Sequence, residues 1–185
     1  MQKRHAPGLL LAAPSLQDPN FQQSVVLLFH HDEDGATGVI INRPTGEPVG
    51  ALLDSIGAVA KDERVLDALM GFGGPVGDGI GWVVFEGEEG LDESFILDGD
   101  LRVSGSRAVL DEILARPRLG RFLFVMGYAG WGPGQLDEEI QSGSWLPIPV
   151  DREILFDVDA IAQWRHAYKS LGIEPDLWLG TIGNA

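Results

Sequence analysis

The chain of 185 residues contains no cysteine. Without thiols it can form neither disulfides nor thiolate zinc or iron–sulfur sites, and no cysteine can act as a nucleophile. This absence is compatible with the reducing cytosol, and we expect a cytoplasmic location.

Long apolar runs are also missing. The run Leu9–Ala13 follows Lys3 and Arg4 but ends at Pro14. It is too short for the apolar region of a signal peptide, which spans about 7–15 residues and leads to a small-residue cleavage site. A membrane-spanning helix needs about 20 apolar residues, and no stretch of the chain approaches that length. The segment predicts a first β-strand and no membrane association.

Positive charge is scarce. Lys and Arg total 13 against 28 Asp and Glu, which gives a net charge of −15 and a pI of about 4.4. Proteins bind duplex DNA mainly through Lys and Arg, so this balance disfavours direct DNA binding. One group of arginines is a candidate patch: Arg102, Arg107, Arg116, Arg118 and Arg121. Because acidic residues interrupt it, we favour ordinary solvated charges on a helix and its exit loop.

Glycine, in contrast, is abundant: the chain has 25. The glycines cluster between apolar segments, which indicates tight turns between short strands. Residues 24–31 form a nearly continuous apolar run, Asp34–Gly35 gives a turn signal, and residues 37–42 form a second run. This pattern predicts a β-hairpin.

The remaining segments show apolar spacings typical of helices in some places and of strands in others. Apolar spacing and turn residues predict helices over residues 48–57, 106–117 and 136–143, the second with Ser106 as its cap, and a last helix from Asp159. That last helix is expected to turn Ile161, Trp164, Tyr168 and Leu171 inward. Further strands are expected at residues 65–70, 81–86, 94–97 and 122–127. Strands and helices do not alternate strictly, which favours a single α+β domain over residues 1–185.

Familiar catalytic patterns are absent. No lysine follows a glycine, which excludes a P-loop, and neither G-x-S-x-G, H-E-x-x-H nor an EF-hand loop occurs. Residues 30–34 (HHDED) offer metal-ligating side chains, but alternate strand residues point to opposite faces, so a polar hairpin tip is the favoured interpretation. We therefore expect no metal and no cofactor, and we favour a non-enzymatic role while an unrecognised enzyme stays the alternative.

Three glycine-rich corners carry the unusual polar and aromatic groups. The loop 127–135 (GYAGWGPGQ) joins a buried strand to a helix and presents Tyr128, Trp131 and Gln135. The two aromatic rings either stack on a ligand or plug the core, with the structural role favoured. Phosphate is disfavoured there, because acidic residues 137–139 fill the first turn of the helix.

The other two corners are Gly73–Gly74 and Asn42–Arg43. The glycines allow either a close approach to a ligand or a tight chain reversal. Arg43 leaves an apolar strand as a lone cation, so it either pairs with a carboxylate, the favoured alternative, or awaits an anionic partner.

Taken together, these segments resemble the YqgE/AlgH family. The resemblance rests on segments that run in family order over nearly the whole chain: residues 8–14, 18–21, 24–28, 35–44, 73–76, 127–131, 134–140, 145–147 and the closing Gly183–Asn184–Ala185. It implies a bacterial protein with a bifurcated or barrel-like, mostly antiparallel sheet surrounded by helices. It supplies no reaction, but it implies an indirect association with transcriptional regulation.

Two hypotheses for function follow. The first is a non-enzymatic regulatory or interaction protein whose partner is another protein. The alternative is a small-ligand-binding protein or an unrecognised enzyme. Its site would combine the three corners: Asn42, Arg43, Gly73, Gly74, Tyr128, Trp131 and Gln135.

Overall fold

The computed structural model describes residues 4–87 and 93–175, so the closing Gly183–Asn184–Ala185 lies outside the described residues. Ten strands occur within the described residues: β1 (Gly8–Ala12), β2 (Val25–Asp32), β3 (Gly35–Ile40), β4 (Pro44–Pro48), β5 (Leu69–Phe72), β6 (Val76–Glu86), β7 (Phe95–Asp98), β8 (Leu101–Ser104), β9 (Phe122–Trp131) and β10 (Trp145–Ile148). Six helices accompany them: α1 (Val49–Ser55), α2 (Arg64–Asp67), α3 (Arg107–Leu114), α4 (Gln135–Gln141), α5 (Arg152–Phe156) and α6 (Ala160–Ser170).

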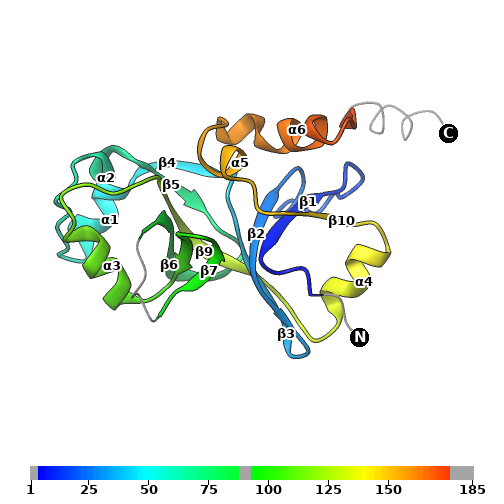
Figure 1. The fold of residues 1–185 in the computed structure, drawn as a ribbon, viewed down its shortest axis with the longest axis horizontal. Helices are drawn as coiled ribbons and strands as arrows, with labels where there is room; N and C mark the ends of the chain where they lie inside the picture. Colours follow the sequence, from blue (N-terminus) through cyan, green and yellow to red (C-terminus); the bar gives the residue numbers. More distant parts are fainter. Residues whose placement is uncertain (1–3, 88–92, 176–185) are drawn as a thin grey trace.

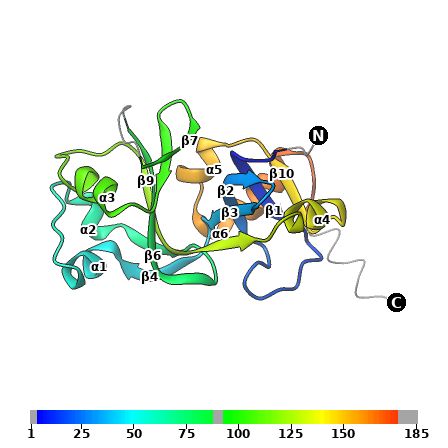
Figure 2. The ribbon, with the colours of Figure 1, turned by 90° about the horizontal axis from the view of Figure 1, so that it is seen from below.

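All the strands belong to one sheet that divides at β9. The main path runs β10-β1-β2-β3-β9-β6-β8-β7, while β5 also pairs with β9 and carries β4 on its other side. Every pairing is antiparallel except that of β5 with β9. Figure 2 shows β9 leaving the half that holds α1, α2 and α3 and running toward α4.

The helices lie in three groups around this sheet (Figure 1). Helices α1, α2 and α3 lie at one end, α4 lies at the other, and α5 and α6 cover the part of the sheet that contains β1 and β2. The sequence-based expectation of an α+β fold with a mostly antiparallel sheet is confirmed. The sheet is open: it divides at β9 and does not close into a barrel.

The hairpin expected around Asp34–Gly35 is present as β2 and β3. The Asp34 amide donates to the Asp32 carboxylate at 2.9 Å, which closes the turn, and Gly35 has a φ of +141° that favours glycine. Strand β1, also expected, pairs with β2.

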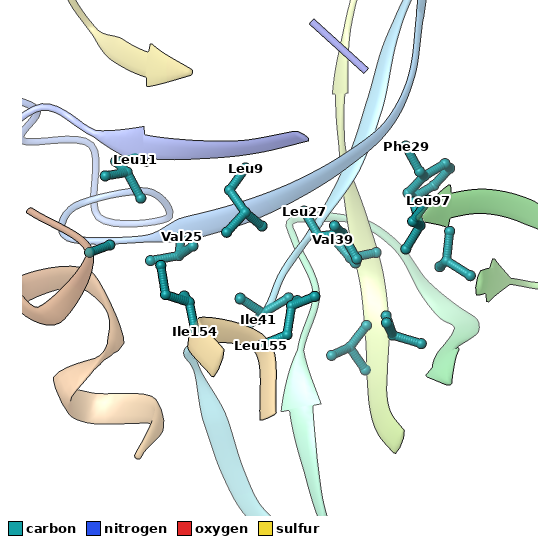
Figure 3. Close-up of a cluster of buried hydrophobic side chains, with 14 of the residues drawn as sticks. Leu9, Leu11, Val25, Leu27, Phe29, Val39, Ile41, Leu97, Ile154 and Leu155 are labelled. Atoms are coloured by element: carbon teal, nitrogen blue, oxygen red, sulfur yellow. The ribbon is translucent and has the colours of Figure 1, made fainter. Parts of the chain in front are cut away.

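The apolar runs of β1 and β2 are continuous because both faces of these strands are buried. Leu9, Leu11, Val25 and Leu27 pack with α5 and α6 in one cluster, part of which Figure 3 shows. Their neighbours Leu10, Val26 and Leu28 face the opposite side, where they pack with residues of β9, α4 and β10. A third cluster fills the space between β6, β9 and the helices α1, α2 and α3.

Helix α6 packs through a narrower stripe than the sequence predicts. Trp164 and Tyr168 are buried and both donate hydrogen bonds to the Ala12 carbonyl, at 2.8 and 3.1 Å. Burial raises the pKa of the Tyr168 hydroxyl to about 12. The expectation for Ile161 and Leu171 is wrong, because these side chains are 85% and 44% exposed. Helix α6 contacts β1 and α5, and these contacts leave both side chains largely in solvent.

The strand expected at residues 65–70 is also wrong. Residues Arg64–Asp67 form the short helix α2, and the strand β5 begins only at Leu69. The cause is Asp62, whose carboxylate accepts hydrogen bonds from the Arg64 amide, the Arg64 guanidinium and the Leu119 amide. These bonds fix a turn at the start of the segment and hold the Asp62 pKa well below its usual range.

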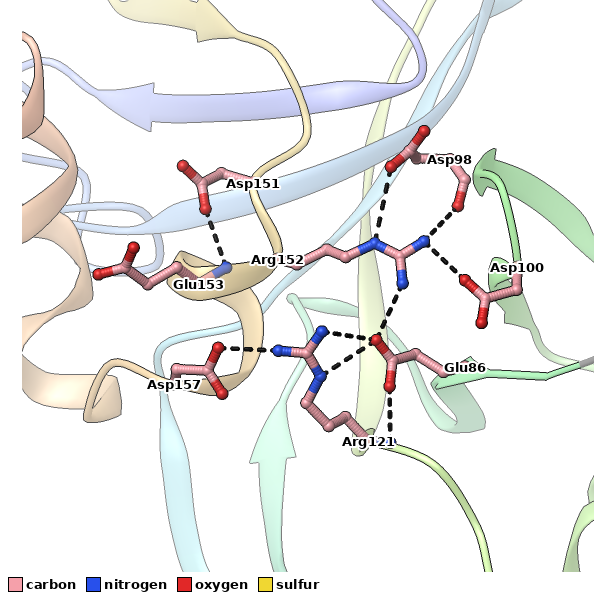
Figure 4. Close-up of polar contacts among 8 residues, drawn as sticks. All are labelled: Glu86, Asp98, Asp100, Arg121, Asp151, Arg152, Glu153 and Asp157. Carbon is pink, nitrogen blue, oxygen red and sulfur yellow. Dashed lines mark hydrogen bonds and ion pairs between the residues drawn. The ribbon is translucent and has the colours of Figure 1, made fainter.

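An ionic network joins α5 to the sheet half that contains β6 and β8 (Figure 4). Glu86 on β6 accepts hydrogen bonds from Arg121 at 2.7 and 3.0 Å and from Arg152 at 2.9 Å. Arg152 also binds Asp100 at 2.7 Å, and Arg121 binds Asp157 at 2.8 Å. Hydrogen bonds from Arg121, followed by those from Arg152, lower the pKa of Glu86 to about 2.

We predict that Glu86→Gln lowers the free energy of unfolding at neutral pH by about 2 kcal/mol. Because the folded pKa of Glu86 lies below its usual value of 4.5, its contribution is present above that value and is lost as pH falls toward about 2. Denaturant unfolding at pH 7 and at pH 3 checks this prediction. The difference in the free energy of unfolding between Glu86→Gln and wild type should shrink at pH 3. The control Glu47→Gln, at an exposed position, should have little effect at either pH. An equal difference at both pH values contradicts the prediction.

Candidate functional site

The corner Asn42–Arg43 holds the loop of residues 18–23. The Asn42 side chain accepts a hydrogen bond from the Val25 amide at 2.8 Å and donates one to the Gln23 carbonyl at 2.9 Å. The Arg43 guanidinium donates to the carbonyls of Pro19 and Gln22, at 3.1 and 2.7 Å. The expected carboxylate partner of Arg43 is therefore replaced by two backbone carbonyls, which satisfy the cation through hydrogen bonds alone.

The corner Gly73–Gly74 lies directly against β9. A Cβ added at Gly73 would come within 2.3 Å of the Gly127 carbonyl oxygen, and one added at Gly74 within 2.2 Å of Tyr128 backbone atoms. Gly74 also has a φ of +150°. Both glycines are therefore needed for the close approach of two backbone segments.

Tyr128 lies on a different face of β9 from Trp131. Its ring packs edge-on against Trp82 with 6.3 Å between centroids, in the same apolar cluster as Phe29. Trp131, three residues further, belongs to the cluster on the opposite side of the sheet. The structure thus separates two aromatic residues that the sequence placed in one loop.

Trp131 and Gln135 instead meet at Glu139. The Oε2 atom of Glu139 accepts hydrogen bonds from Nε1 of Trp131 at 2.9 Å and from Nε1 of Trp145 at 2.8 Å. The Oε1 atom accepts a hydrogen bond from Gln135 at 2.8 Å. Helix α4 positions Gln135 and Glu139 one turn apart on the same face. One carboxylate therefore fixes two indole rings that come from β9 and β10.

These groups line a hollow that we call the aromatic cleft, with a volume of about 260 Å³. Its lining residues are Leu16, Asp18, Phe21, Gly130, Trp131, Gln135, Glu139, Ser144 and Trp145. Arg43 supports one wall indirectly, because its contact with Pro19 lies in the same loop as Asp18 and Phe21. Of the candidate residues, Trp131 and Gln135 line the cleft, whereas Gly73, Gly74 and Tyr128 do not.

Three residues of the cleft were not among the predicted site residues: Phe21, Glu139 and Trp145. Glu139 was interpreted only as one of several charges that repel an anion from the helix start. The i, i+4 spacing of Gln135 and Glu139 was the available signal, since it puts both side chains on one helix face. Nothing local to the sequence places Trp145 or Phe21 beside them.

A second hollow, which we call the apolar pocket, also escaped the sequence analysis. It has a volume of about 350 Å³ and lies between α1, β6, the start of α3, and β9. Its lining is mostly apolar: Leu52, Leu53, Ile56, Met70, Gly79, Ile80, Gly81, Trp82, Val83, Ser104, Gly105, Ser106, Arg107, Leu110, Phe124, Val125 and Met126.

The serines of the apolar pocket are already paired with the chain. Ser104 donates to the Glu93 carbonyl at 2.6 Å and accepts a hydrogen bond from the Ser106 amide at 3.1 Å. Ser106 occupies the N-cap position before α3, as the sequence predicts, but its side chain donates to the Glu93 carboxylate and makes no capping hydrogen bond to the helix. Its apolar walls therefore dominate what the pocket offers to a ligand.

The histidines of residues 30–34 point in different directions. His31 is buried, accepts a hydrogen bond from the His5 amide at 3.2 Å and lies 3.7 Å from Asp137, whereas His30 pairs with Asp32 at 3.0 Å. Within residues 4–87 and 93–175, no three His, Asp or Glu side chains gather closely enough to hold a metal ion.

The arginines of the expected patch are dispersed. Arg107 pairs with Asp111, Arg116 with Glu112, and Arg121 with Glu86. The expectation of solvated charges on a helix is wrong for Arg102. This residue lies on β8, and only 4% of its surface is exposed. Its Nε atom has no hydrogen-bond partner among the described residues.

Across residues 4–87 and 93–175, no helix is both long and apolar enough to cross a membrane.

The open α+β sheet, divided at β9 and flanked by three helical groups, is also found in solved structures. The solution structure of the AlgH protein from Pseudomonas aeruginosa superposes with a TM-score of 0.76 at 33% identity, covering 100% of both chains. The crystal structure of a Corynebacterium diphtheriae protein gives a TM-score of 0.72 at 23% identity, covering 91% of this chain and 88% of that one, and so supports the fold alone.

The family follows from sequence as well. The AlgH-like family profile matches residues 9–176, and the chain belongs to this family. A UPF0301 protein of Paracoccus denitrificans is 40% identical over 181 residues, covering 96% of this chain and 95% of the relative. A UPF0301 protein of Burkholderia vietnamiensis is 38% identical over 178 residues, covering 95% of this chain and 93% of the relative. These relatives are bacterial, and the resemblance noted from the sequence is confirmed.

We predict that Asn42→Ala loosens the loop of residues 18–23, because it removes the acceptor of the Val25 amide and the donor to the Gln23 carbonyl. Stability should fall by about 1–2 kcal/mol. The exchange of the Val25 amide proton, followed by NMR, should become faster. The matched control is Asn20→Ala, since Asn20 is exposed and lies in the same loop. Unchanged protection at Val25 in Asn42→Ala is incompatible with this role.

Proposed function

We propose that this protein acts by binding a partner protein in the cytoplasm rather than by catalysis, and that the apolar pocket is the docking site. The observation that carries the proposal is the rim of the pocket. Ile56 and Ile80 line it and are also 39% and 43% exposed to solvent. Large apolar side chains at the mouth of an apolar hollow are typical of interaction surfaces.

The shape of the pocket supports an apolar side chain as its occupant. The walls come from α1, β6, α3 and β9, and most of the lining residues have apolar side chains. Burying one large apolar side chain contributes about 1.5–3 kcal/mol, which makes such a residue a natural anchor for a docked segment. The serines are held within the chain, so shape and apolar contact select the partner.

The acidic charge of this chain favours a partner segment with basic residues on either side of that apolar anchor. The chain carries a net charge of −15, and the exposed carboxylates Asp54 and Asp78 lie close in sequence to the rim residues Ile56 and Ile80. A partner segment with a bulky apolar residue between Lys or Arg residues complements both features. Electrostatic complementarity of this kind speeds association and weakens at high salt.

A regulatory role is then indirect. The resemblance to the YqgE/AlgH family implies an association with regulation, and we propose that this chain exerts it through its protein partner. Direct contact with DNA is not part of the proposal. Three of the five arginines that formed the candidate patch are already paired with carboxylates.

A second candidate function, binding of a small ligand, is favoured by a separate observation, the aromatic cleft. Of the residues expected for such a site only Trp131 and Gln135 line it, and Gly74 has no part in it.

We predict that Ile80→Asp abolishes partner capture. The change places a charge at the rim of the apolar pocket, and we expect at least about tenfold weaker binding, which is 1.4 kcal/mol. Tagged wild-type and variant proteins are used to capture partners from bacterial lysate at low and high salt, and bound protein is quantified.

The matched control is Ile161→Asp, which changes the same residue type at an exposed position on α6. The proposal predicts a stoichiometric, salt-sensitive partner with wild type and Ile161→Asp, and its loss with Ile80→Asp. Capture of no partner at low salt, or equal loss with both variants, refutes it.

A further inference from the structure

The aromatic cleft has three aromatic rings arranged around a hollow. The centroids of Phe21 and Trp145 lie 5.7 Å apart with ring planes at 79°, and those of Trp131 and Trp145 lie 5.9 Å apart at 81°. Phe21 and Trp131 complete the set at 6.4 Å. The Trp145 ring is steeply inclined to the other two, whereas the Phe21 and Trp131 planes meet at 32°. The three rings therefore form no single flat stack, and all three residues line the hollow.

The lining of this cleft contains acidic residues and no basic ones. Asp18 and Glu139 line it, and neither Lys nor Arg is among its lining residues. Glu139 receives its hydrogen bonds from two indoles and an amide, which are neutral donors. Its carboxylate therefore has ordered geometry without a cation to balance it among these contacts.

Aromatic faces attract cations through the negative potential above the ring, and several such faces together recognise alkylated ammonium groups. Carboxylates strengthen this preference and disfavour anions. We propose that the aromatic cleft binds an organic cation, with an alkylated ammonium group held among Phe21, Trp131 and Trp145 and balanced by Asp18 and Glu139. This goes beyond the proposed partner docking, which uses different residues.

The size of the cleft limits the ligand. A volume of about 260 Å³ is smaller than that of common drug-sized sites, which span roughly 300–1,000 Å³. The exposed residues Asp18, Gly130 and Gln135 lie in its lining, so the cleft opens to solvent. A small quaternary ammonium ion fits these limits, either as a free metabolite or as the end of a methylated lysine side chain.

The test is a titration of the full chain with choline, followed by calorimetry and by tryptophan fluorescence. The matched ligand is 3,3-dimethylbutanol, which has the shape of choline but no charge. Saturable binding of choline, with much weaker binding of the neutral analogue, supports the proposal. A peptide that contains trimethyl-lysine is titrated in parallel, and tighter binding of either cation identifies the source of the ligand within the same chemistry.

Two conservative variants locate the site. Phe21→Leu keeps an apolar side chain but removes one ring face, and we expect about tenfold weaker choline binding. Asp18→Asn removes one charge. The side-chain oxygen of the new residue can still accept the hydrogen bond that the Asn20 backbone amide donates to Asp18 at 2.8 Å. This variant should weaken binding several-fold. Asp54→Asn, an exposed charge on α1, is the matched control and should change nothing.

Three results overturn the proposal. The first is that well-folded wild-type protein binds neither choline nor the trimethyl-lysine peptide. The second is that the neutral analogue binds as tightly as choline, which indicates a merely apolar hollow. The third is that Asp54→Asn weakens binding as much as Asp18→Asn, which indicates nonspecific attraction to an acidic surface. Partner capture with Ile80→Asp is independent of all three results.

Discussion

The fold depends on the backbone pairing of β9, which serves two parts of the sheet at once. Its first half pairs with β6 on one edge and β5 on the other, and its last residues pair with β3. The close approach of Gly73 and Gly74 to Gly127 and Tyr128 makes this sharing possible, because no Cβ fits between the two backbones. Gly127 itself has a φ of +77°, which bends the strand where the neighbours change.

This constraint also separates the two hollows. The apolar pocket lies against the first half of β9, at Phe124, Val125 and Met126, whereas the aromatic cleft lies at its end, at Gly130 and Trp131. Each hollow therefore has its own walls of helix and strand. The two hollows share no lining residue, so each proposal is tested with substitutions that do not touch the other hollow.

Local signals in the sequence predict much of this structure. The hairpin of β2 and β3, the first strand and the helices near residues 49 and 107 follow from apolar periodicity and turn residues. The strand predicted at residues 65–70 was wrong up to Asp67, because a distant contact of Asp62 with Leu119 fixes a turn and the short helix α2 there. The prediction that Ile161 is buried was wrong, because periodicity shows that a helix has an apolar face but not how much of that face its neighbours cover.

The candidate site illustrates the same limit. Trp131 and Gln135 stand in one glycine-rich segment, and the sequence marks both. Phe21 and Trp145 reach them only through pairings of strands that are far apart in the chain, so no local pattern reveals the ring arrangement. The sequence favoured a carboxylate partner for Arg43, but its partners are backbone carbonyls, which have no residue-type signal at all.

Glu86 and Glu139 show why the cleft, and not the ionic network, is the place to look for a ligand. Glu86 is bound by two arginines, which lower its pKa to about 2 and leave it no free charge to offer. Glu139 is held just as firmly, by three hydrogen bonds of 2.8–2.9 Å, but all three come from neutral groups. The first arrangement stabilises the protein through internal neutralisation. The second fixes a carboxylate beside aromatic faces without neutralising it, and a cation from outside the chain is what completes its electrostatics.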